Sequence, residues 1–166
     1  MANMGKSTKR FRVLFVCLGN ICRSPAAEGI MRHLVEEQGL ENEFEIESAG
    51  IGAWHVGQLP DDRMRRCASE RGYWLGSHAR QIERNDLENC DLIIVMDKEN
   101  LHDVQNMAHS DEEKVKIRLM TEYCTSRFAS YKEVPDPYYG GSRGFELVLD
   151  MLEDACNGLI SRLTKE

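Results

Sequence analysis

A cysteine and an arginine near the start of the chain have a spacing suited to phosphate chemistry. Five residues separate Cys17 from Arg23, and this stretch joins an apolar segment to a segment that opens with Ser24-Pro25. A short loop that curls around one point directs successive backbone N–H groups inward, and a helix that starts there adds the positive end of its dipole. Cys17 would lie in that positive field, which favours a thiolate. The pattern predicts a loop that holds a phosphate over a nucleophilic sulfur.

Several residues of this loop have an expected task. Gly19 is expected to relieve the tight curvature, because glycine adopts positive φ angles without strain. Arg23 supplies a planar fork that matches two phosphate oxygens. The Ser24 hydroxyl is expected to donate to the Cys17 thiolate and to help it leave in a second step. A lone cysteine is more often a small buried side chain, but the ordered series of strand, cysteine, glycine, arginine, serine and proline favours the functional interpretation. The predicted phosphate-binding loop comprises Leu18, Gly19, Asn20, Ile21, Cys22 and Ser24.

An aspartate late in the chain could supply the proton that such a reaction needs. A thiolate that attacks phosphorus expels an alkoxide or phenoxide, which leaves more easily when an acid protonates it. Asp136 lies between Pro135 and Pro137, and two prolines hold this segment extended and out of a helix. An aspartate beside proline is also common in turns, so the assignment depends on the loop at Cys17. With that partner, Asp136 is predicted to be the acid.

Alternating strands and helices are expected to position these residues. Ser24 is the expected N-cap of a helix that has Pro25 as its first residue and ends at Gly39. The alternation predicts an α/β fold with an open parallel sheet, helices on both faces, and ligands beyond the carboxyl ends of the strands. Apolar patterns predict strands at residues 12–16, 44–48, 92–96 and 116–120, and further helices at 60–71, 98–107 and the end of the chain.

Length and composition limit the classes of function. The chain has 166 residues, which fits one domain over 11–166 after a polar, basic and flexible arm over 1–10. A net charge of −7 argues against nonspecific binding to nucleic acid or anionic membranes. The longest apolar run, residues 92–96, is too short to cross a bilayer, and no secretory signal opens the chain. Six cysteines without CxxC or zinc spacing favour a cytoplasmic protein with free thiols and no metal site.

Two segments together resemble the low-molecular-weight protein tyrosine phosphatases. One is Val16-Cys17-Leu18-Gly19-Asn20-Ile21-Cys22-Arg23-Ser24-Pro25, and the other is Asp136-Pro137-Tyr138-Tyr139-Gly140. The similarity covers nearly everything after the polar arm. Between the two segments it extends through Glu47-Ser48-Ala49-Gly50, Trp54, His78-Ala79-Arg80-Gln81 and Met96-Asp97.

The resemblance implies a fold and a mechanism. The fold is a four-stranded parallel sheet in the order 2-1-3-4, and the reaction passes through a phosphocysteine intermediate without a cofactor. Cys17 is the implied nucleophile, Arg23 binds the phosphate, and Asp136 acts first as acid and then as base. The implied partners are tyrosine-phosphorylated proteins, and the enzyme is expected to be a monomer.

The resemblance also implies supporting roles. Asn20 is expected to hold the loop through contacts with Ser48 and His78, although His78 could simply be a surface histidine. Cys22 is expected to form a disulfide with oxidised Cys17, the alternative being a small packing residue. Trp54, Tyr138 and Tyr139 match positions that wall the slot for the aromatic ring of the substrate, and for Trp54 the alternative is ordinary core packing. Arg80 and Asp97 are expected to be structural partners.

Two other functions compete with this one. Thioredoxin-coupled arsenate reductases share the fold and the loop, but they need two further cysteines after the third strand. Residues 96–101 contain none, and Cys90 precedes that strand. A non-catalytic phosphotyrosine-binding module would not need Cys17 and Asp136 together. Turnover of para-nitrophenyl phosphate without added metal would distinguish an enzyme from a binding module.

Overall fold

Four parallel strands form the centre of the protein. The computed structural model describes residues 9–137 and 141–164. The strands are β1 (Phe11–Cys17), β2 (Phe44–Gly50), β3 (Leu92–Val95) and β4 (Ile117–Leu119), in the order β2-β1-β3-β4. The predicted four-stranded parallel sheet and its order are therefore confirmed.

The order of the strands determines where a ligand can bind. The chain leaves β1 for β2 on one side and then crosses to β3 on the other side of β1. In such sheets the crevice beyond the carboxyl ends of the two strands at this reversal is the usual ligand site. Cys17 is the last residue of β1 and pairs with Gly50 of β2, while Val16 pairs with Val95 of β3. The predicted nucleophile therefore lies at this reversal point.

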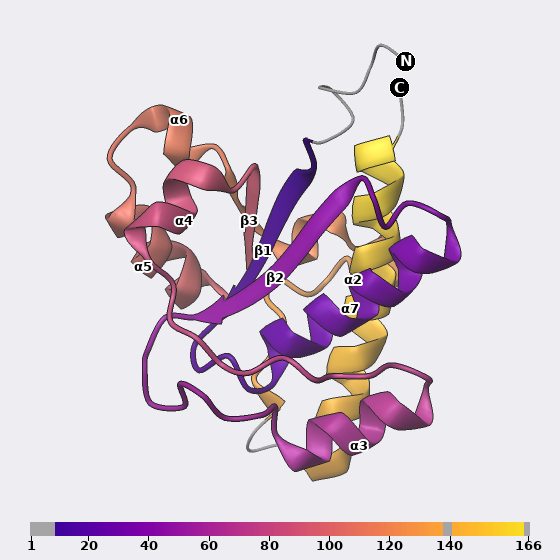
Figure 1. Cartoon of the computed structure of the whole chain (residues 1–166). Helices are drawn as coiled ribbons and strands as arrows, with labels where there is room; N and C mark the ends of the chain where they lie inside the picture. Colours follow the sequence, from indigo (N-terminus) through magenta and orange to yellow (C-terminus); the bar gives the residue numbers. More distant parts are fainter. Residues whose placement is uncertain (1–8, 138–140, 165–166) are drawn as a thin grey trace.

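Helices cover both faces of the sheet, as predicted (Figure 1). Helices α2 (Arg23–Glu37) and α7 (Gly141–Thr164) pack side by side on one face, and α3 (Asp62–Glu70) packs against α7. The short helices α4 (Arg84–Asn89) and α6 (Asp111–Lys114) lie with α5 (Lys98–Met107) on the other face. The 3-10 helices η1 (Met120–Tyr123) and η2 (Ser126–Phe128) precede α7. None of the helices in the described part of the chain has the length and apolarity needed to cross a membrane.

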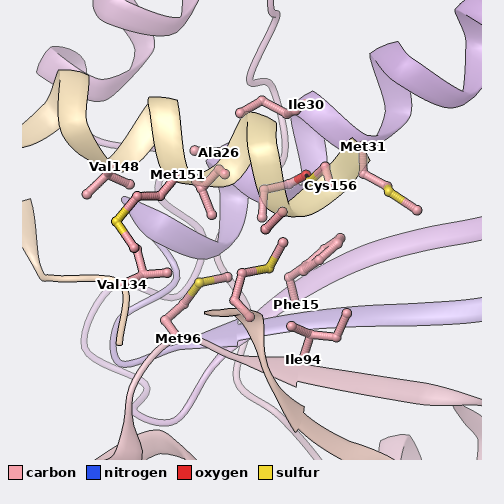
Figure 2. Packing of buried hydrophobic residues seen from close by; sticks show 14 of the residues in the cluster. Phe15, Ala26, Ile30, Met31, Ile94, Met96, Val134, Val148, Met151 and Cys156 are labelled. Carbon is pink, nitrogen blue, oxygen red and sulfur yellow. Dashed lines mark hydrogen bonds between the residues drawn. The ribbon is translucent and has the colours of Figure 1, made fainter. Parts of the chain in front are cut away.

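The alternation of side chains along β1 builds two hydrophobic cores. Phe15 points to the side of α2 and α7, while Leu14 and Val16 point to the side of α4 and α5. Figure 2 shows Phe15 and Ile94 of the sheet facing side chains from these two long helices. Burial on both faces holds β1 rigidly, so the loop that follows it starts from a fixed point.

The predicted helix starts need two corrections. Helix α2 begins at Arg23 with Cys22 at the N-cap position, so Ser24 is not the cap and Pro25 is not the first helical residue. The Ser24 hydroxyl does not cap the helix because it contacts the Cys17 sulfur instead. The helix predicted over 60–71 begins at Asp62, because the Asp61 side chain accepts hydrogen bonds from two backbone N–H groups of its first turn.

Candidate active site

The Cys17 sulfur lies beneath the start of α2. Cys17 is only 3% exposed. Its sulfur accepts a hydrogen bond from the Ser24 backbone N–H at 3.4 Å and contacts the Ser24 hydroxyl at 3.0 Å. The hydroxyl can donate to the sulfur or to the Ala49 carbonyl, 3.4 Å away. A thiolate can only accept, so an ionised Cys17 would accept hydrogen bonds from both the Ser24 hydroxyl and the Ser24 backbone N–H.

Asn20 gives the loop its shape. Its φ angle is 59°, and within the described ranges no other non-glycine residue has a positive φ. Asparagine tolerates this conformation because its side chain can hydrogen-bond locally. The amide nitrogen donates to Ser24 Oγ at 2.7 Å and to Ser48 Oγ at 3.0 Å, while the amide oxygen accepts from the Arg80 backbone N–H at 3.0 Å. The buried Asn20 side chain thus joins the loop to β2 and to the segment before α4.

Two details of the loop differ from the expectations. Gly19 is not among the glycines with positive φ, and the left-handed residue is Asn20. Gly19 instead leaves room for a neighbouring side chain, since a Cβ there would lie 3.0 Å from Cδ2 of the His55 ring. The predicted contact of Asn20 with Ser48 is present, but the Asn20 amide oxygen binds the backbone of Arg80, and His78 is exposed.

A buried glutamate continues this network. The Ser48 hydroxyl donates to Glu28 Oε1 at 2.6 Å, and Glu28 also accepts from Arg32 Nε at 3.0 Å and Nη2 at 2.9 Å. The chain of contacts therefore runs from Cys17 through Ser24, Asn20 and Ser48 to Glu28. Sequence reasoning missed Glu28, which falls among the polar positions of α2. A glutamate four residues before an arginine normally indicates an exposed helix pair.

The Arg23 side chain is buried, and two acceptors bind its Nη1 group. Its Nη1 donates to Asp97 Oδ2 at 2.8 Å and to the Val134 carbonyl at 3.0 Å, and its Nη2 lies 3.9 Å from Asp136 Oδ2. Burial disfavours the charge of Arg23, but Cys17 and Asp97 outweigh this effect and raise the pKa of the guanidinium above its ordinary value. Asp97 also caps α5 by accepting from the Asn100 backbone N–H. It is thus a structural partner, while Asp136 approaches from the side of the cavity.

These groups surround a cavity of about 200 Å³. Cys17 lies deep in it, whereas Trp54, at its rim, is 68% exposed. A Cβ at Gly52 would overlap the Trp54 ring, so this indole lies directly against the backbone. Tyr138 and Tyr139, the other predicted ring-binding residues, lie outside the described residues. The cavity is lined by Cys17, Leu18, Gly19, Ile21, Cys22, Arg23, Trp54, His55 and Asp136.

Cys22 and His55 are further groups in the same cavity. Burial, together with Asp61 and Cys17, raises the pKa of Cys22 to about 12, so this side chain is a neutral thiol at physiological pH. His55 Nδ1 lies 2.9 Å from Gln58 Oε1, which fixes the orientation of the imidazole ring. Sequence reasoning missed His55 because it follows Trp54 in an irregular loop, where neither spacing nor periodicity marks it.

Comparisons with known proteins agree with this geometry. The family model described as low molecular weight phosphotyrosine protein phosphatase matches residues 12–166. The low molecular weight protein-tyrosine-phosphatase of Streptomyces coelicolor is 39% identical over 156 residues, which are 94% of this chain and 95% of that protein. The low molecular weight phosphotyrosine protein phosphatase of Schizosaccharomyces pombe is 45% identical over 139 residues, 83% of this chain and 87% of that one.

Solved structures are similar over the same range. A protein tyrosine phosphatase from Entamoeba histolytica superposes with a TM-score of 0.88 at 43% identity, covering 92% of this chain and 96% of that one. The Drosophila arginine phosphatase superposes with a TM-score of 0.85 at 30% identity, covering 93% and 98%. Matches over nearly the whole of both chains place the protein in one enzyme family. The chain is a member of the low molecular weight phosphotyrosine protein phosphatases, which are hydrolases.

Proposed function

We propose that the protein hydrolyses phosphotyrosine in proteins through a phosphocysteine intermediate, with Cys17 as nucleophile. The observation that supports this most strongly is the environment of the Cys17 sulfur. It lies deep in the cavity, within 3.4 Å of a backbone N–H and 3.0 Å of a hydroxyl. Both groups stabilise a thiolate, and in the first step the thiolate attacks phosphorus. The S–P bond forms as the P–O bond to the aryl group breaks, and Asp136 gives its proton to the departing oxygen.

The second step returns the enzyme to its starting state. Asp136, now a carboxylate, takes a proton from a water molecule, and this water attacks phosphorus. The S–P bond breaks, inorganic phosphate leaves, and the Ser24 hydroxyl donates to the thiolate that departs. Asp97 and Val134 already occupy Nη1 of Arg23. We therefore expect the remaining donors on Nε and Nη2 to bind two phosphate oxygens, in the ground state and in both transition states.

The depth of the sulfur would give selectivity for aryl phosphates. A phosphate that reaches Cys17 must be carried on a side chain long enough to pass the rim, where the Trp54 indole offers a face for an aromatic ring. We propose that Tyr138 and Tyr139 complete this slot, and that Ser48 supports the loop through its hydrogen bond with Asn20. A phosphoserine side chain is too short for this geometry. The similarity to an arginine phosphatase makes phosphoarginine a necessary competitor in any test of selectivity.

Several broader features belong to the same proposal. The six free cysteines fit a reducing compartment, so we place the enzyme in the cytoplasm. We expect a monomeric, metal-independent domain over residues 11–166 that binds neither nucleic acid nor membranes, with residues 1–10 as an arm. We further propose that peroxide oxidises Cys17 to a sulfenic acid and that the Cys22 sulfur displaces water from it, forming an S–S bond.

Hydrolysis of para-nitrophenyl phosphate in the presence of EDTA tests the proposal. Cys17→Ser is expected to abolish turnover while phosphate binding persists, because the loop N–H groups and Arg23 bind the anion independently of the sulfur. Cys67→Ser, at a half-buried cysteine of α3, is the matched control and keeps its activity. Activity of the Cys17→Ser protein within tenfold of the native enzyme would remove the nucleophile assignment. Equal turnover of phosphotyrosine, phosphoserine and phosphoarginine peptides would contradict the proposed selectivity.

A further inference from the structure

A second exposed tryptophan lies away from the active-site cavity, on a segment with anchored neighbours. The side chain of Trp74 is 84% exposed, although its neighbours are anchored. The Tyr73 hydroxyl donates to Glu153 Oε2 at 2.7 Å, and Leu75 packs against Gly29 of α2, where a Cβ would overlap it. A Cβ at Gly76 would likewise overlap the Trp74 ring, so the indole lies directly over this glycine.

This arrangement repeats that of Trp54 at the active-site cavity. Both indoles are largely exposed, and each covers a glycine two residues away, Gly52 in one case and Gly76 in the other. Contact with backbone on one face leaves the other parts of the ring open while restricting its rotation. A large aromatic surface that is already oriented loses little conformational entropy when it binds a partner. The geometry of Trp74 is therefore that of a contact residue.

Trp74 lines two hollows of different charge. One has a volume of about 440 Å³ and lies against α2, where two carboxylates and one arginine, Glu28, Glu36 and Arg32, leave a net negative charge. The other has a volume of about 580 Å³ and lies against α3, where its charged residues are Asp62, Arg65 and Arg66. The hollow at α3 therefore carries a net positive charge.

In the α3 hollow, the positive charge without an ion-pair partner among the described residues is that of Arg66. Arg65 forms an ion pair with Asp62, whereas Arg66 is exposed and has no salt bridge with any residue in the described ranges. The whole chain has a net charge of −7, so its overall field repels an acidic partner. A positive hollow beside an open indole, on a protein of this charge, is complementary to an acidic segment that also carries an apolar side chain.

Helix α3 links this surface to the active site. The Asp61 backbone N–H donates to the carbonyl of Ile21 in the phosphate-binding loop at 2.8 Å, and α3 starts at the next residue. The helix has nine residues and so leads about 14 Å away from the loop (Figure 1). An extended peptide covers that distance in about four to five residues. A substrate chain of that length that follows α3 out of the cavity would pass Arg66, which lies halfway along the helix.

We propose that Trp74 and Arg66 form a docking site for an acidic segment of the phosphoprotein substrate. The segment lies about four to six residues from the phosphotyrosine, with its carboxylates near Arg66 and an apolar side chain against Trp74. This inference rests on the proposed function, because it assumes that the phosphotyrosine occupies the cavity above Cys17. It adds a specificity element outside that cavity.

Kinetics with designed peptides test the docking site. The probes carry a phosphotyrosine, a five-residue Gly/Ser spacer and then Leu-Glu-Glu-Glu, in both chain directions, with glutamine replacing glutamate in matched peptides. At low salt we expect kcat/KM to be about tenfold higher for at least one acidic peptide than for its glutamine match. Trp74→Ala and Arg66→Glu should each remove most of that preference, and Trp74→Phe should retain part of it. Turnover of para-nitrophenyl phosphate by all three variants should stay within twofold of the native enzyme.

Lys114→Glu is the matched control. It makes the same change in charge at an exposed residue of α6, on the opposite face of the sheet. If this variant removes the preference as fully as Arg66→Glu does, the effect is one of net charge and the docking site is refuted. The same conclusion follows if no acidic peptide is preferred, or if the preference survives in both Trp74→Ala and Arg66→Glu.

A binding measurement separates docking from catalysis. The chain has two tryptophans, so Trp54→Phe leaves Trp74 as the sole indole. Titration with the unphosphorylated acidic peptide should change its fluorescence, and the Arg66→Glu substitution should weaken this binding about tenfold. If the Trp74 fluorescence does not change but the protein hydrolyses aryl phosphates, the docking site is refuted and the proposed function is not. If the fluorescence change is saturable but the protein hydrolyses no aryl phosphate, the proposed function is refuted, and Trp74 and Arg66 then form a peptide-binding surface without a catalytic role.

Discussion

Replacement of Asn20 by alanine should separate the shape of the phosphate-binding loop from its charge. Asn20 carries no charge, is 2% exposed and has a positive φ angle. Its side chain makes three hydrogen bonds, to Ser24, Ser48 and the Arg80 backbone, at distances of 2.7 to 3.0 Å. Asn20→Ala removes all three while leaving a side chain that disfavours this backbone conformation. The formal charge of the site is unchanged.

The size of the effect follows from these contacts. Each buried hydrogen bond contributes about 1 kcal/mol net, so the three together contribute about 3 kcal/mol. The left-handed conformation costs an alanine about 1 kcal/mol more. Asn20→Ala should therefore lower the free energy of unfolding by about 4 kcal/mol, a large part of the total for a domain of this kind. Asn20→Gly loses the same hydrogen bonds without the steric strain, so its loss should be about 1 kcal/mol smaller.

Urea denaturation followed by circular dichroism measures these differences, and kcat/KM for para-nitrophenyl phosphate reports on the loop. Both variants should have a lower kcat/KM than the native enzyme, even at urea concentrations where circular dichroism shows that they are still folded. Asn106→Ala, at an exposed asparagine of α5, is the control and should change stability by less than about 0.5 kcal/mol. A loss below 1 kcal/mol in both Asn20 variants would refute the idea that the amide holds the loop. Equal losses in the two variants would refute the contribution of strain.

Three further predictions concern the reacting groups. Arg23→Lys should lower kcat/KM by about 10² or more despite its positive charge, because lysine cannot span two phosphate oxygens; near-native kinetics would show that Arg23 does not touch the phosphate. Asp136→Ala should lower kcat by roughly 10²–10⁴ for poor leaving groups and by less for acidic phenols; a uniform loss across a series of aryl phosphates would assign Asp136 to binding. Peroxide should inactivate the enzyme, and dithiothreitol should restore its activity. The Cys22→Ser variant should keep its turnover, but dithiothreitol should no longer restore it after peroxide treatment. Peptide mapping that finds no disulfide between Cys17 and Cys22 would exclude the redox role.

The strands could be predicted from the sequence because local pattern and burial agree there. The apolar segments at 12–16 and 92–96 correspond to β1 and β3, which are buried on both faces of the sheet. Such strands need no information from distant residues, since a continuous apolar run already identifies them. Helix α7 was equally clear, because its buried residues recur at helical spacing over 24 residues. The short helices α4 and α6 were missed, since four to six residues are too few to show a period.

The chemistry of the phosphate-binding loop could be predicted from the sequence, but its conformation could not. Its residue types indicate phosphate chemistry, yet the local pattern predicts Ser24 as a helix cap, which its contact with Cys17 excludes. The local pattern predicts a positive φ angle at Gly19, whereas Asn20 adopts it. Both conformations are decided by side-chain contacts that local propensity does not show: Ser24 contacts Cys17 across the loop, and the partners of Asn20 lie farther away in the chain. The Asn20 amide binds Ser48 and Arg80, which are 28 and 60 residues distant. Local propensity yields to such contacts.

The balance of charges around Arg23 explains why these distant contacts matter for function. Arg23 is paired with Asp97 and lies near Asp136, and an ionised Cys17 would add a further negative charge. The formal charges of the site therefore sum to no positive excess that could attract a phosphate dianion into a protein of net charge −7. We infer that the attraction comes from backbone N–H groups directed into the cavity and from the start of α2. Directed dipoles act only at the correct angle, so we expect phosphate binding to depend on the neutral Asn20 side chain that fixes the loop as well as on Arg23.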